Sequence, residues 1–245
     1  MNKLINIIFK EAGFELYEGI NFKGNYSTNF SFFTRTNNNK FDFYLVAKFK
    51  EGEVALEGLQ DQLDQCFDSI LMEISVSGID KNLSLLLLLE TESLYYSKER
   101  TKYIYSLEED PYDFKKYVLT YTKNQLETLE NKLNETREVP VIEVLNYLLQ
   151  EKKLFTSFKK KQEDRSPVEG QEANLYDLVS KLFIKLPFLS VIMKQEELVS
   201  LKKEIDEKLN QTQTKIVSLM LEQHSKDPEL NINDILPAIG VEYIE

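Results

Sequence analysis

Residues that could act as nucleophiles or bases are scarce in this sequence. It contains one cysteine, Cys66, and one histidine, His224. A serine or cysteine hydrolase needs a histidine beside its nucleophile and an acid that orients the histidine. Cys66 falls on the apolar face of a predicted helix, which favours a small core residue, and His224 falls near a predicted helix end, where the helix dipole favours it. The sequence therefore predicts no catalytic residues of this kind.

Glycine patterns that bind phosphate are also missing. The eight glycines are scattered, and no two are closer than five positions. The sequence has neither GxxxxGKS/T nor GxGxxG, so it lacks the loop whose backbone amides would cradle a nucleotide. We expect no nucleotide cofactor, and any nucleotide hydrolysis would belong to a partner.

A metal-dependent nuclease of the restriction type is the main enzymatic alternative. Such a site places an acid on one strand and an Asp/Glu-x-Lys on the next, so that two carboxylates hold Mg²⁺ and the lysine polarises the phosphate or the water. Asp42 begins a strand-like run and could supply the first acid. Glu90 ends another such run, but Thr91 and Glu92 follow it where a lysine is needed. The Glu-x-Lys matches, Glu130 to Lys132 and Glu151 to Lys153, lie in predicted helices, so we expect no bound metal.

The composition indicates a folded, acidic chain. Of the 245 residues, 42% are hydrophobic and 29% are charged, and the net charge is −11. Affinity for phosphates needs a basic surface, so we expect the isolated chain to bind duplex DNA weakly at physiological salt. Contact with DNA would then come only through a complex in which a partner supplies the cations. KKLFTSFKKK (152–161) is the one basic cluster that could act against this expectation.

The sequence also predicts the compartment. One cysteine cannot form an internal disulfide or a Cys-rich zinc site, which fits a reducing cytoplasm. The apolar run at the start of MNKLINIIFKEAGFELYEG is too short for a signal peptide. The nearest approach to a membrane span, residues 182–193, is broken by Lys185 and Pro187, so no membrane span is predicted. We therefore expect a cytoplasmic protein.

The N-terminal half has the pattern of an α+β region. Residues 25–36 and 41–49 are rich in aromatic and β-branched side chains and are separated by NNNK, which predicts a hairpin. The apolar run of residues 82–90 predicts a central strand that is buried on both faces. Further predicted elements are helices over residues 2–12 and 54–74 and a strand over residues 101–109.

From Asp110 onward the spacing of apolar residues is helical. We predict an α+β region over residues 1–110 and a helical extension packed on it over residues 111–158. A polar segment with Pro167 and Gly170 predicts a flexible linker over residues 159–171. A C-terminal helical region would cover residues 172–245, with helices at about 172–186 and 194–223. The predicted fold class is α+β, with a mixed N-terminal sheet and helices followed by a largely helical C-terminal region.

The most distinctive stretch is SLEEDPYDFKKYVLTY, residues 106–121. It predicts a helix start with Asp110 as N-cap, Pro111 at the first position and acidic residues near the positive helix end. Thr122 and Gln125 resemble a second capping box. Capping does not explain why the aromatic residues gather here, and tyrosines suit protein interfaces, so both an architectural and an interface role remain open. The candidate interface residues are Glu108, Glu109, Asp110, Tyr112, Phe114, Lys115, Lys116 and Tyr117.

This stretch, preceded by KNLSLLLLLE and further back by FDFYLVAKF, resembles the middle component of bacterial ABC-three-component systems, the group that includes the Lamassu-type defence operons. The similarity covers roughly residues 40–122, and the acidic-proline-aromatic-lysine string is its most specific part. Residues 160–245 add nothing to it. The family carries no catalytic residues that could be transferred to this sequence.

The resemblance implies an accessory subunit encoded beside an SMC/Rad50-like ABC ATPase and a nuclease-type effector. Such a subunit would link or restrain the other parts of an anti-phage complex without catalysis of its own. The lack of a nucleotide loop and of an evident active site is compatible with that role. Two alternatives stay open: a metal-dependent nuclease of restriction-like fold with a degenerate site, and an unrelated cytosolic adaptor.

The missing phosphate loop and the missing strand-borne Glu-x-Lys generate a first prediction. We expect the purified chain neither to hydrolyse ATP nor to cut DNA in the presence of Mg²⁺ or Mn²⁺. Phosphate release and plasmid nicking are the measurements, with Asp42→Ala as the matched variant. Metal-dependent cleavage by the wild type that Asp42→Ala abolishes would contradict this expectation and support the nuclease alternative.

Overall fold

The computed structural model describes residues 1–22, 29–37, 40–52, 56–76, 78–94, 98–110, 115–164, 170–192, 213–214 and 217–218. The chain divides into two compact units, Met1–Val191 and Ile192–Glu245. The first unit contains all the elements discussed below. In the second, residues 213–214 and 217–218 are helical. Most of the predicted helix over residues 194–223, and His224, lie outside the described residues.

A five-stranded mixed sheet forms the centre of the first unit. Its strands lie side by side in chain order and are β1 (Glu15–Leu16), β2 (Phe30–Asn37), β3 (Lys40–Lys50), β4 (Leu83–Thr91) and β5 (Lys115–Thr122). Neighbours are antiparallel from β1 to β3 and parallel from β3 to β5. The predicted α+β class, the β2–β3 hairpin and the β4 strand are confirmed.

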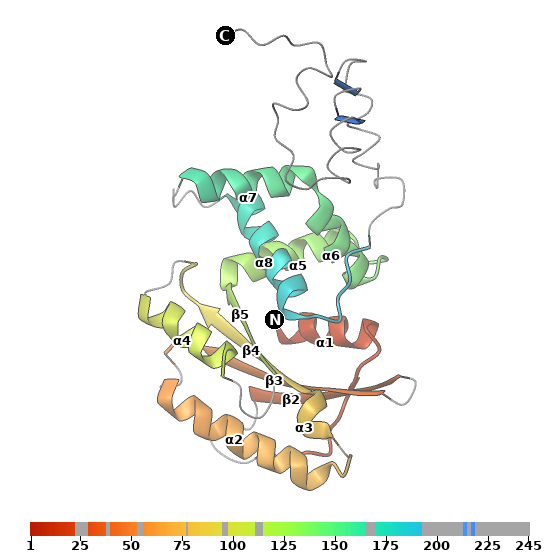
Figure 1. Cartoon of the computed structure of the whole chain (residues 1–245), viewed down its shortest axis with the longest axis vertical. Coiled ribbons are helices and arrows are strands. Elements are labelled where there is room, and N and C mark those ends of the chain that lie inside the picture. The colour runs from red at the N-terminus through yellow and green to blue at the C-terminus, as the bar shows by residue number, and fades with distance from the viewer. Residues whose placement is uncertain are drawn as a thin grey trace. The chain divides into compact units, whose positions relative to one another are not determined.

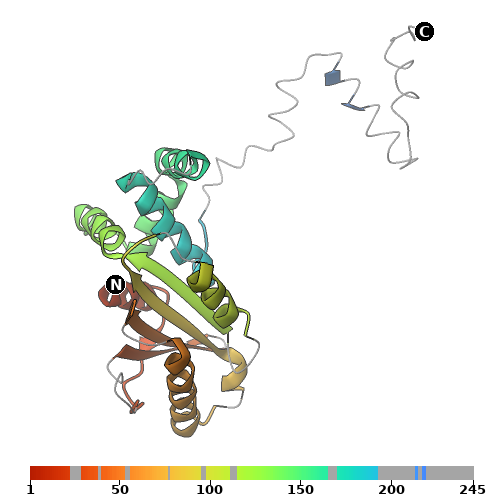
Figure 2. The same ribbon diagram turned by 90° about the vertical axis from the view of Figure 1, so that its left-hand side faces the viewer.

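One face of the sheet is covered by the helices that connect its parallel strands. Parallel neighbours cannot be joined by a tight turn, so a crossover must pass over one face. Between β3 and β4 the chain forms α2 (Leu56–Glu73) and α3 (Ile79–Asn82), and between β4 and β5 it forms α4 (Lys98–Glu108). Figures 1 and 2 show these helices together on one side of the sheet. The apolar cluster below them includes Phe32, Leu45, Leu63, Cys66, Ile70, Leu85 and Val118.

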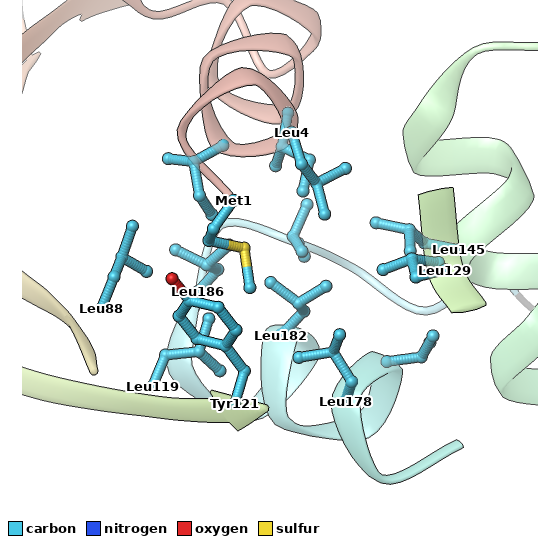
Figure 3. Close-up of a cluster of buried hydrophobic side chains, with 14 of the residues drawn as sticks. Met1, Leu4, Leu88, Leu119, Tyr121, Leu129, Leu145, Leu178, Leu182 and Leu186 are labelled. Atoms are coloured by element: carbon cyan, nitrogen blue, oxygen red, sulfur yellow. The ribbon is translucent and has the colours of Figure 1, made fainter. Parts of the chain in front are cut away.

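The other face is covered by helices from both ends of the first unit. These are α1 (Asn2–Glu11), α5 (Lys123–Glu135), α6 (Val141–Gln150), α7 (Lys152–Asp164) and α8 (Gln171–Lys185). Figure 3 shows the cluster that they share with the sheet, where Met1 and Leu4 of the first segment meet Tyr121 of β5 and Leu182 of α8. The first unit is therefore a sheet between two helical layers.

Burial on both faces explains the composition of the two central strands. Leu85 and Leu87 of β4 enter the α2 side, whereas Leu86 and Leu88 enter the α1 side. All four side chains are at most 2% exposed, as predicted for this strand. In β3 the alternation predicts one face more buried than the other, but Tyr44 and Leu45 are both buried because helices cover both sides.

Two predictions around residue 110 are wrong. In the segment predicted as a strand, residues 101–109, all residues up to Glu108 belong to α4, and the segment predicted as a helix after Asp110 contains β5. The apolar residues of 115–122 fit both the helical period and the alternating period of a strand. Parallel pairing with β4 decides in favour of a strand. The region from Asp110 is thus not purely helical, and Asp110 is not the N-cap of a helix that continues through Tyr121.

The first part of the predicted linker is also not a linker. Helix α7 continues to Asp164, so the first part of the predicted 159–171 linker is helical, and α8 begins at Gln171. Residues 165–169, with Pro167, lie outside the described residues. The predicted helices over residues 2–12, 54–74 and 172–186 correspond to α1, α2 and α8 and are confirmed.

The single cysteine provides a test of the α2 layer. Cys66 is 2% exposed, and burial raises the pKa of its thiol to about 12. Because the thiolate is the reactive form, we expect a thiol reagent at pH 8 to label the native protein at least about 100-fold more slowly than the denatured chain.

The same pKa predicts how stability depends on pH. The folded pKa is raised, so the contribution of Cys66 to the free energy of unfolding is present below the ordinary pKa of 9.0 and is lost as the pH rises towards about 12.

In the labelling experiment, the chain in guanidinium chloride is the control for reagent quality. Labelling of native and denatured protein at similar rates would show that α2 does not cover this side chain.

Candidate functional site

The site is the α4–β5 junction, which we define as residues 108–117. It contains all eight residues that the sequence indicates as candidate interface residues. Helix α4 ends at Glu108 and β5 begins at Lys115. Because β5 is the last strand in the sheet order, the junction lies at a sheet edge.

Glu108 connects three elements of the fold. Its Oε1 accepts a hydrogen bond from the backbone amide of Val118 at 2.7 Å. The same oxygen forms an ion pair with Nζ of Lys185 at 2.5 Å. The side chains of Glu108 and Lys185 are 17% and 23% exposed. One carboxylate therefore holds the end of α4, the edge strand β5 and the last turn of α8 together.

Asp110 and Lys116 form a second connection across the junction. Nζ of Lys116 lies 2.9 Å from Oδ2 of Asp110. The Lys116 side chain has no exposed surface, and that of Asp110 is 22% exposed. A buried ammonium needs a compensating charge, so this pair links Asp110, which follows α4, to the start of β5 through Lys116.

The remaining candidates differ in exposure. Glu109 and Lys115 are exposed, whereas Tyr117 is half-buried. Burial, and secondarily the charge of Glu108, raises the pKa of the Tyr117 hydroxyl. Tyr112 and Phe114 lie outside the described residues. Three predicted members are thus engaged within the fold through polar contacts, and two present charge to the surroundings.

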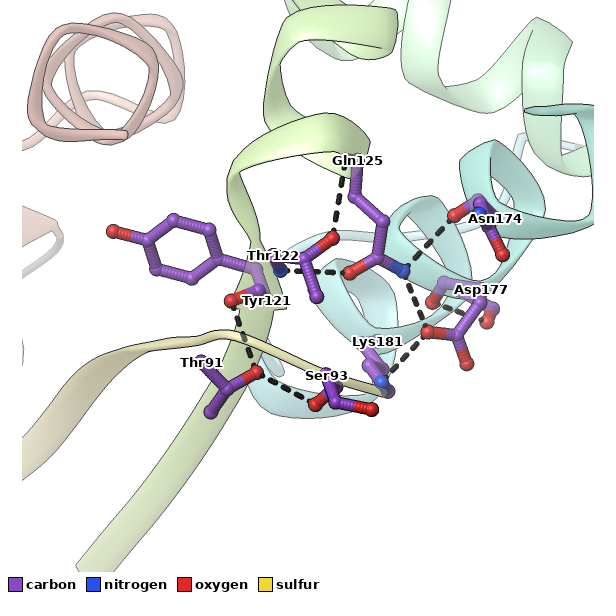
Figure 4. Close-up of polar contacts among 9 residues, drawn as sticks. Thr91, Ser93, Tyr121, Thr122, Gln125, Asn174, Asp177 and Lys181 are labelled. Atoms are coloured by element: carbon purple, nitrogen blue, oxygen red, sulfur yellow. Dashed lines mark hydrogen bonds and ion pairs between the residues drawn. The ribbon is translucent and has the colours of Figure 1, made fainter. Parts of the chain in front are cut away.

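The far end of β5 is held by a buried polar network that the sequence indicates only in part (Figure 4). Thr122 and Gln125 form the predicted capping box. The backbone N–H of Gln125 donates to Oγ1 of Thr122 at 3.3 Å, and the backbone N–H of Thr122 donates to Oε1 of Gln125 at 3.0 Å. Nε2 of Gln125 also donates to the carbonyl of Asn174 and, at 2.8 Å, to the carboxylate of Asp177. Lys181 completes the network 2.6 Å from Asp177.

This network attaches α8 to the end of the sheet. Gln125 is fully buried, so each of its amide hydrogen bonds replaces one that water would have supplied. Local spacing predicts the capping box, because both partners lie within one helical turn. The α8 partners lie about 50 residues away in the sequence, and no local pattern could identify them.

The acids considered for a nuclease site have structural partners. Oδ2 of Asp42 accepts hydrogen bonds from Nε and Nη2 of Arg35, at 3.2 and 2.7 Å. The same guanidinium donates to the carbonyl of Ala12 and lies 4.3 Å from the ring centroid of Phe14. The Arg35–Asp42 pair thus ties the β2–β3 hairpin to the end of α1.

Glu90 accepts a hydrogen bond from the hydroxyl of Tyr121 at 3.3 Å. Within the described parts of the chain, no group of three or more His, Cys, Asp and Glu side chains is placed to hold a metal ion. Asp42 and Glu90 therefore both contact side chains of neighbouring strands.

Residues 24–144 match the family MComp1, described as "ABC-three component (ABC-3C) system Middle Component 1". The match extends from just before β2 to the first turn of α6, slightly less than half of the chain, and includes the whole α4–β5 junction. Neither a curated protein nor a solved structure matches the chain. None of the described helices combines the length and apolarity that a membrane crossing requires.

The two adjacent glutamates of the junction give a matched test of its architecture. Glu108→Ala removes the acceptor of the Val118 amide and the partner of Lys185, so we expect a loss of about 2–3 kcal/mol in the free energy of unfolding. Glu109→Ala removes the same charge from an exposed position and should change that free energy by less than about 0.5 kcal/mol. Urea titration of both variants measures the difference. Equal effects would show that Glu108 does not hold the junction together.

Proposed function

We propose that this protein is the middle component of an ABC-three-component anti-phage system and acts as a non-enzymatic assembly subunit in the cytoplasm. It would link or restrain an SMC/Rad50-like ABC ATPase and a nuclease-type effector, as in Lamassu-type operons. The family match over residues 24–144 is the observation that carries the proposal. Contact with DNA would pass mainly through the other subunits, since this chain has a net charge of −11.

The matched segment contains the junction and the strands and helices that flank it in the chain. It includes β2 to β5, the helices α2 to α5, and both polar pairs, Asp110–Lys116 and Arg35–Asp42. A rigid edge strand and a rigid helix end can present neighbouring side chains in a fixed arrangement. A rigid surface binds a partner at a lower entropic cost than a mobile one.

The outer face of α4 adjoins the exposed residues of the α4–β5 junction. A hollow of about 500 Å³ lies along it, and its described lining includes Lys102, Tyr105 and Glu109. Tyr105 is 57% exposed on this face. Exposed tyrosines are enriched at protein interfaces because a large apolar ring ends in a polar hydroxyl. Together with Glu109 and Lys115, Tyr105 is our choice for the contact with a partner subunit.

Co-purification from a host that expresses the neighbouring genes tests the proposal. We expect the tagged chain to retain an ABC ATPase and an effector encoded beside it. We also expect Tyr105→Ala/Glu109→Arg to weaken this retention at least tenfold, because loss of an interface tyrosine can cost about 2 kcal/mol of binding. Both positions are exposed, so the thermal midpoint of the isolated chain should stay within about 2 °C of the wild type.

Helix α6 offers a control pair of the same chemistry and spacing. Tyr147 is 68% exposed and Glu143 is exposed, and both positions lie on α6. Tyr147→Ala/Glu143→Arg should leave the complex intact. Equal losses from both pairs would contradict the α4–β5 surface. The absence of an ABC ATPase among the neighbouring genes and the retained proteins would contradict the proposed function and return the question to an unrelated cytosolic adaptor.

A further inference from the structure

Helix α7 presents a row of basic and aromatic side chains, which we call the α7 stripe: Lys152, Phe155, Lys159 and Lys160. The first three follow the i, i+3, i+7 spacing that places side chains on one face of a helix, and Lys160 adjoins them. All four side chains are exposed, and Phe155 is 43% exposed. Lys152 and Lys159 are two turns apart, or about 10.5 Å along the helix axis.

The stripe stands on a firmly packed helix. Leu154 on another face of α7 is buried, and the rings of Phe155 and Phe158 lie 5.6 and 5.2 Å from the ring of Tyr176 on α8. The ammonium of Lys159 lies 5.8 Å from the centroid of Phe155. These contacts give the lysines of the stripe a stable base.

Charge at this surface differs from that of the chain as a whole. Glu172 of α8 is held by Lys153 at 2.5 Å and by Ser157 at 2.9 Å. Among the carboxylates of the described residues, none forms an ion pair with Lys152, Lys159 or Lys160. A chain with a net charge of −11 thus carries a local cluster of cations that these carboxylates do not neutralise.

We propose that the α7 stripe binds the phosphate backbone of a nucleic acid. Lysines contact phosphates without regard to base sequence, and the release of counterions drives the association. Phe155, between Lys152 and Lys159, offers an apolar ring to a sugar or a base. The inference goes beyond the proposed assembly function and does not depend on it.

The acidic remainder of the chain does not prevent such a contact. At about 0.1 M salt the Debye length is about 10 Å, so distant carboxylates are screened from a phosphate that touches the stripe. The contact would be weak alone and useful in a complex, where other subunits hold the nucleic acid nearby. Weak binding by the isolated chain at physiological salt is compatible with this role.

The composition of the stripe favours a nucleic acid over an acidic protein partner. Protein interfaces have a dry apolar core and are depleted in lysine. Here lysine dominates, and the stripe has a single aromatic ring, that of Phe155, in place of an apolar core. A nucleic acid backbone, with its regularly spaced phosphates, suits such a surface better than a folded protein does.

The test uses the full chain and a fluorescent duplex of about 25 base pairs, with binding measured by anisotropy from about 50 to 200 mM salt. We expect a Kd on the order of 10⁻⁵ M at the lowest salt. Lys159→Glu/Lys160→Glu should weaken binding at least about tenfold there and reduce the slope of log K against log salt by about 2.

Helix α1 offers the matched control, because Lys3 and Lys10 are also exposed on one helix. Lys3→Glu/Lys10→Glu changes the net charge by the same amount and should alter the affinity by less than about threefold. Thermal midpoints of both variants should stay within about 2 °C of the wild type, which keeps a folding defect apart from a binding defect.

Three outcomes would overturn the proposal. The first is no detectable binding by the wild type at the lowest salt, and the second is an equal loss from the α7 and α1 variants. The third is competition by poly-glutamate at the same charge concentration as strong as that by unlabelled duplex, which would assign the stripe to an acidic protein. None of these outcomes bears on co-purification through α4, so the two proposals fail separately.

Discussion

The parallel pairing of β3, β4 and β5 is the constraint on which the rest of the first unit depends. Parallel neighbours require crossovers, so the chain must place α2, α3 and α4 on one face of the sheet. The leucines of β4 enter both faces, and the second face therefore also needs a cover. Helices from both ends of the unit, α1 and α5 to α8, supply it. A helical N-terminus and helices that follow the sheet are consequences of one doubly buried strand.

At the edge of the sheet, polar side chains provide hydrogen bonds to backbone groups, which apolar packing cannot provide. An edge strand presents backbone groups that can pair with another chain. In β5, Glu108 occupies the amide of Val118 and Gln125 occupies that of Thr122. The same two side chains reach α8 through Lys185 and Asp177. The same set of contacts therefore pairs these two backbone amides of β5 and attaches α8 to the sheet.

This arrangement influences what kind of recognition the junction can support. With Glu108, Asp110 and Lys116 engaged inside the fold, recognition at the described part of the junction falls to exposed side chains such as Glu109 and Lys115. The neighbouring α4 face adds the ring of Tyr105. On the opposite layer of the sheet, α7 carries an exposed row of lysines. The described surface thus separates a mixed polar-aromatic region from a basic one.

The sequence by itself determined those elements whose pattern has one physical reading. The amphipathic α1 and α2, the β2–β3 hairpin, the all-apolar β4, the Thr122–Gln125 capping box and buried Cys66 follow from spacing within a few residues. These features depend on local propensity and on a single period of burial, and both can be read from neighbouring positions.

Only the tertiary structure decided the secondary structure of α4 and β5. In α4 the buried side chain is Leu107, too little to mark a helix, and residues 115–122 satisfy both a helical and an alternating period. The free edge of β4 selects the strand, because pairing satisfies backbone groups that a sequence window cannot show to be available. Glu108 and Lys185 are 77 residues apart, and their pairing exists only because β5 and α8 are already packed. An acidic string that looks like a helix cap therefore becomes a connection between a helix end, an edge strand and a distant helix.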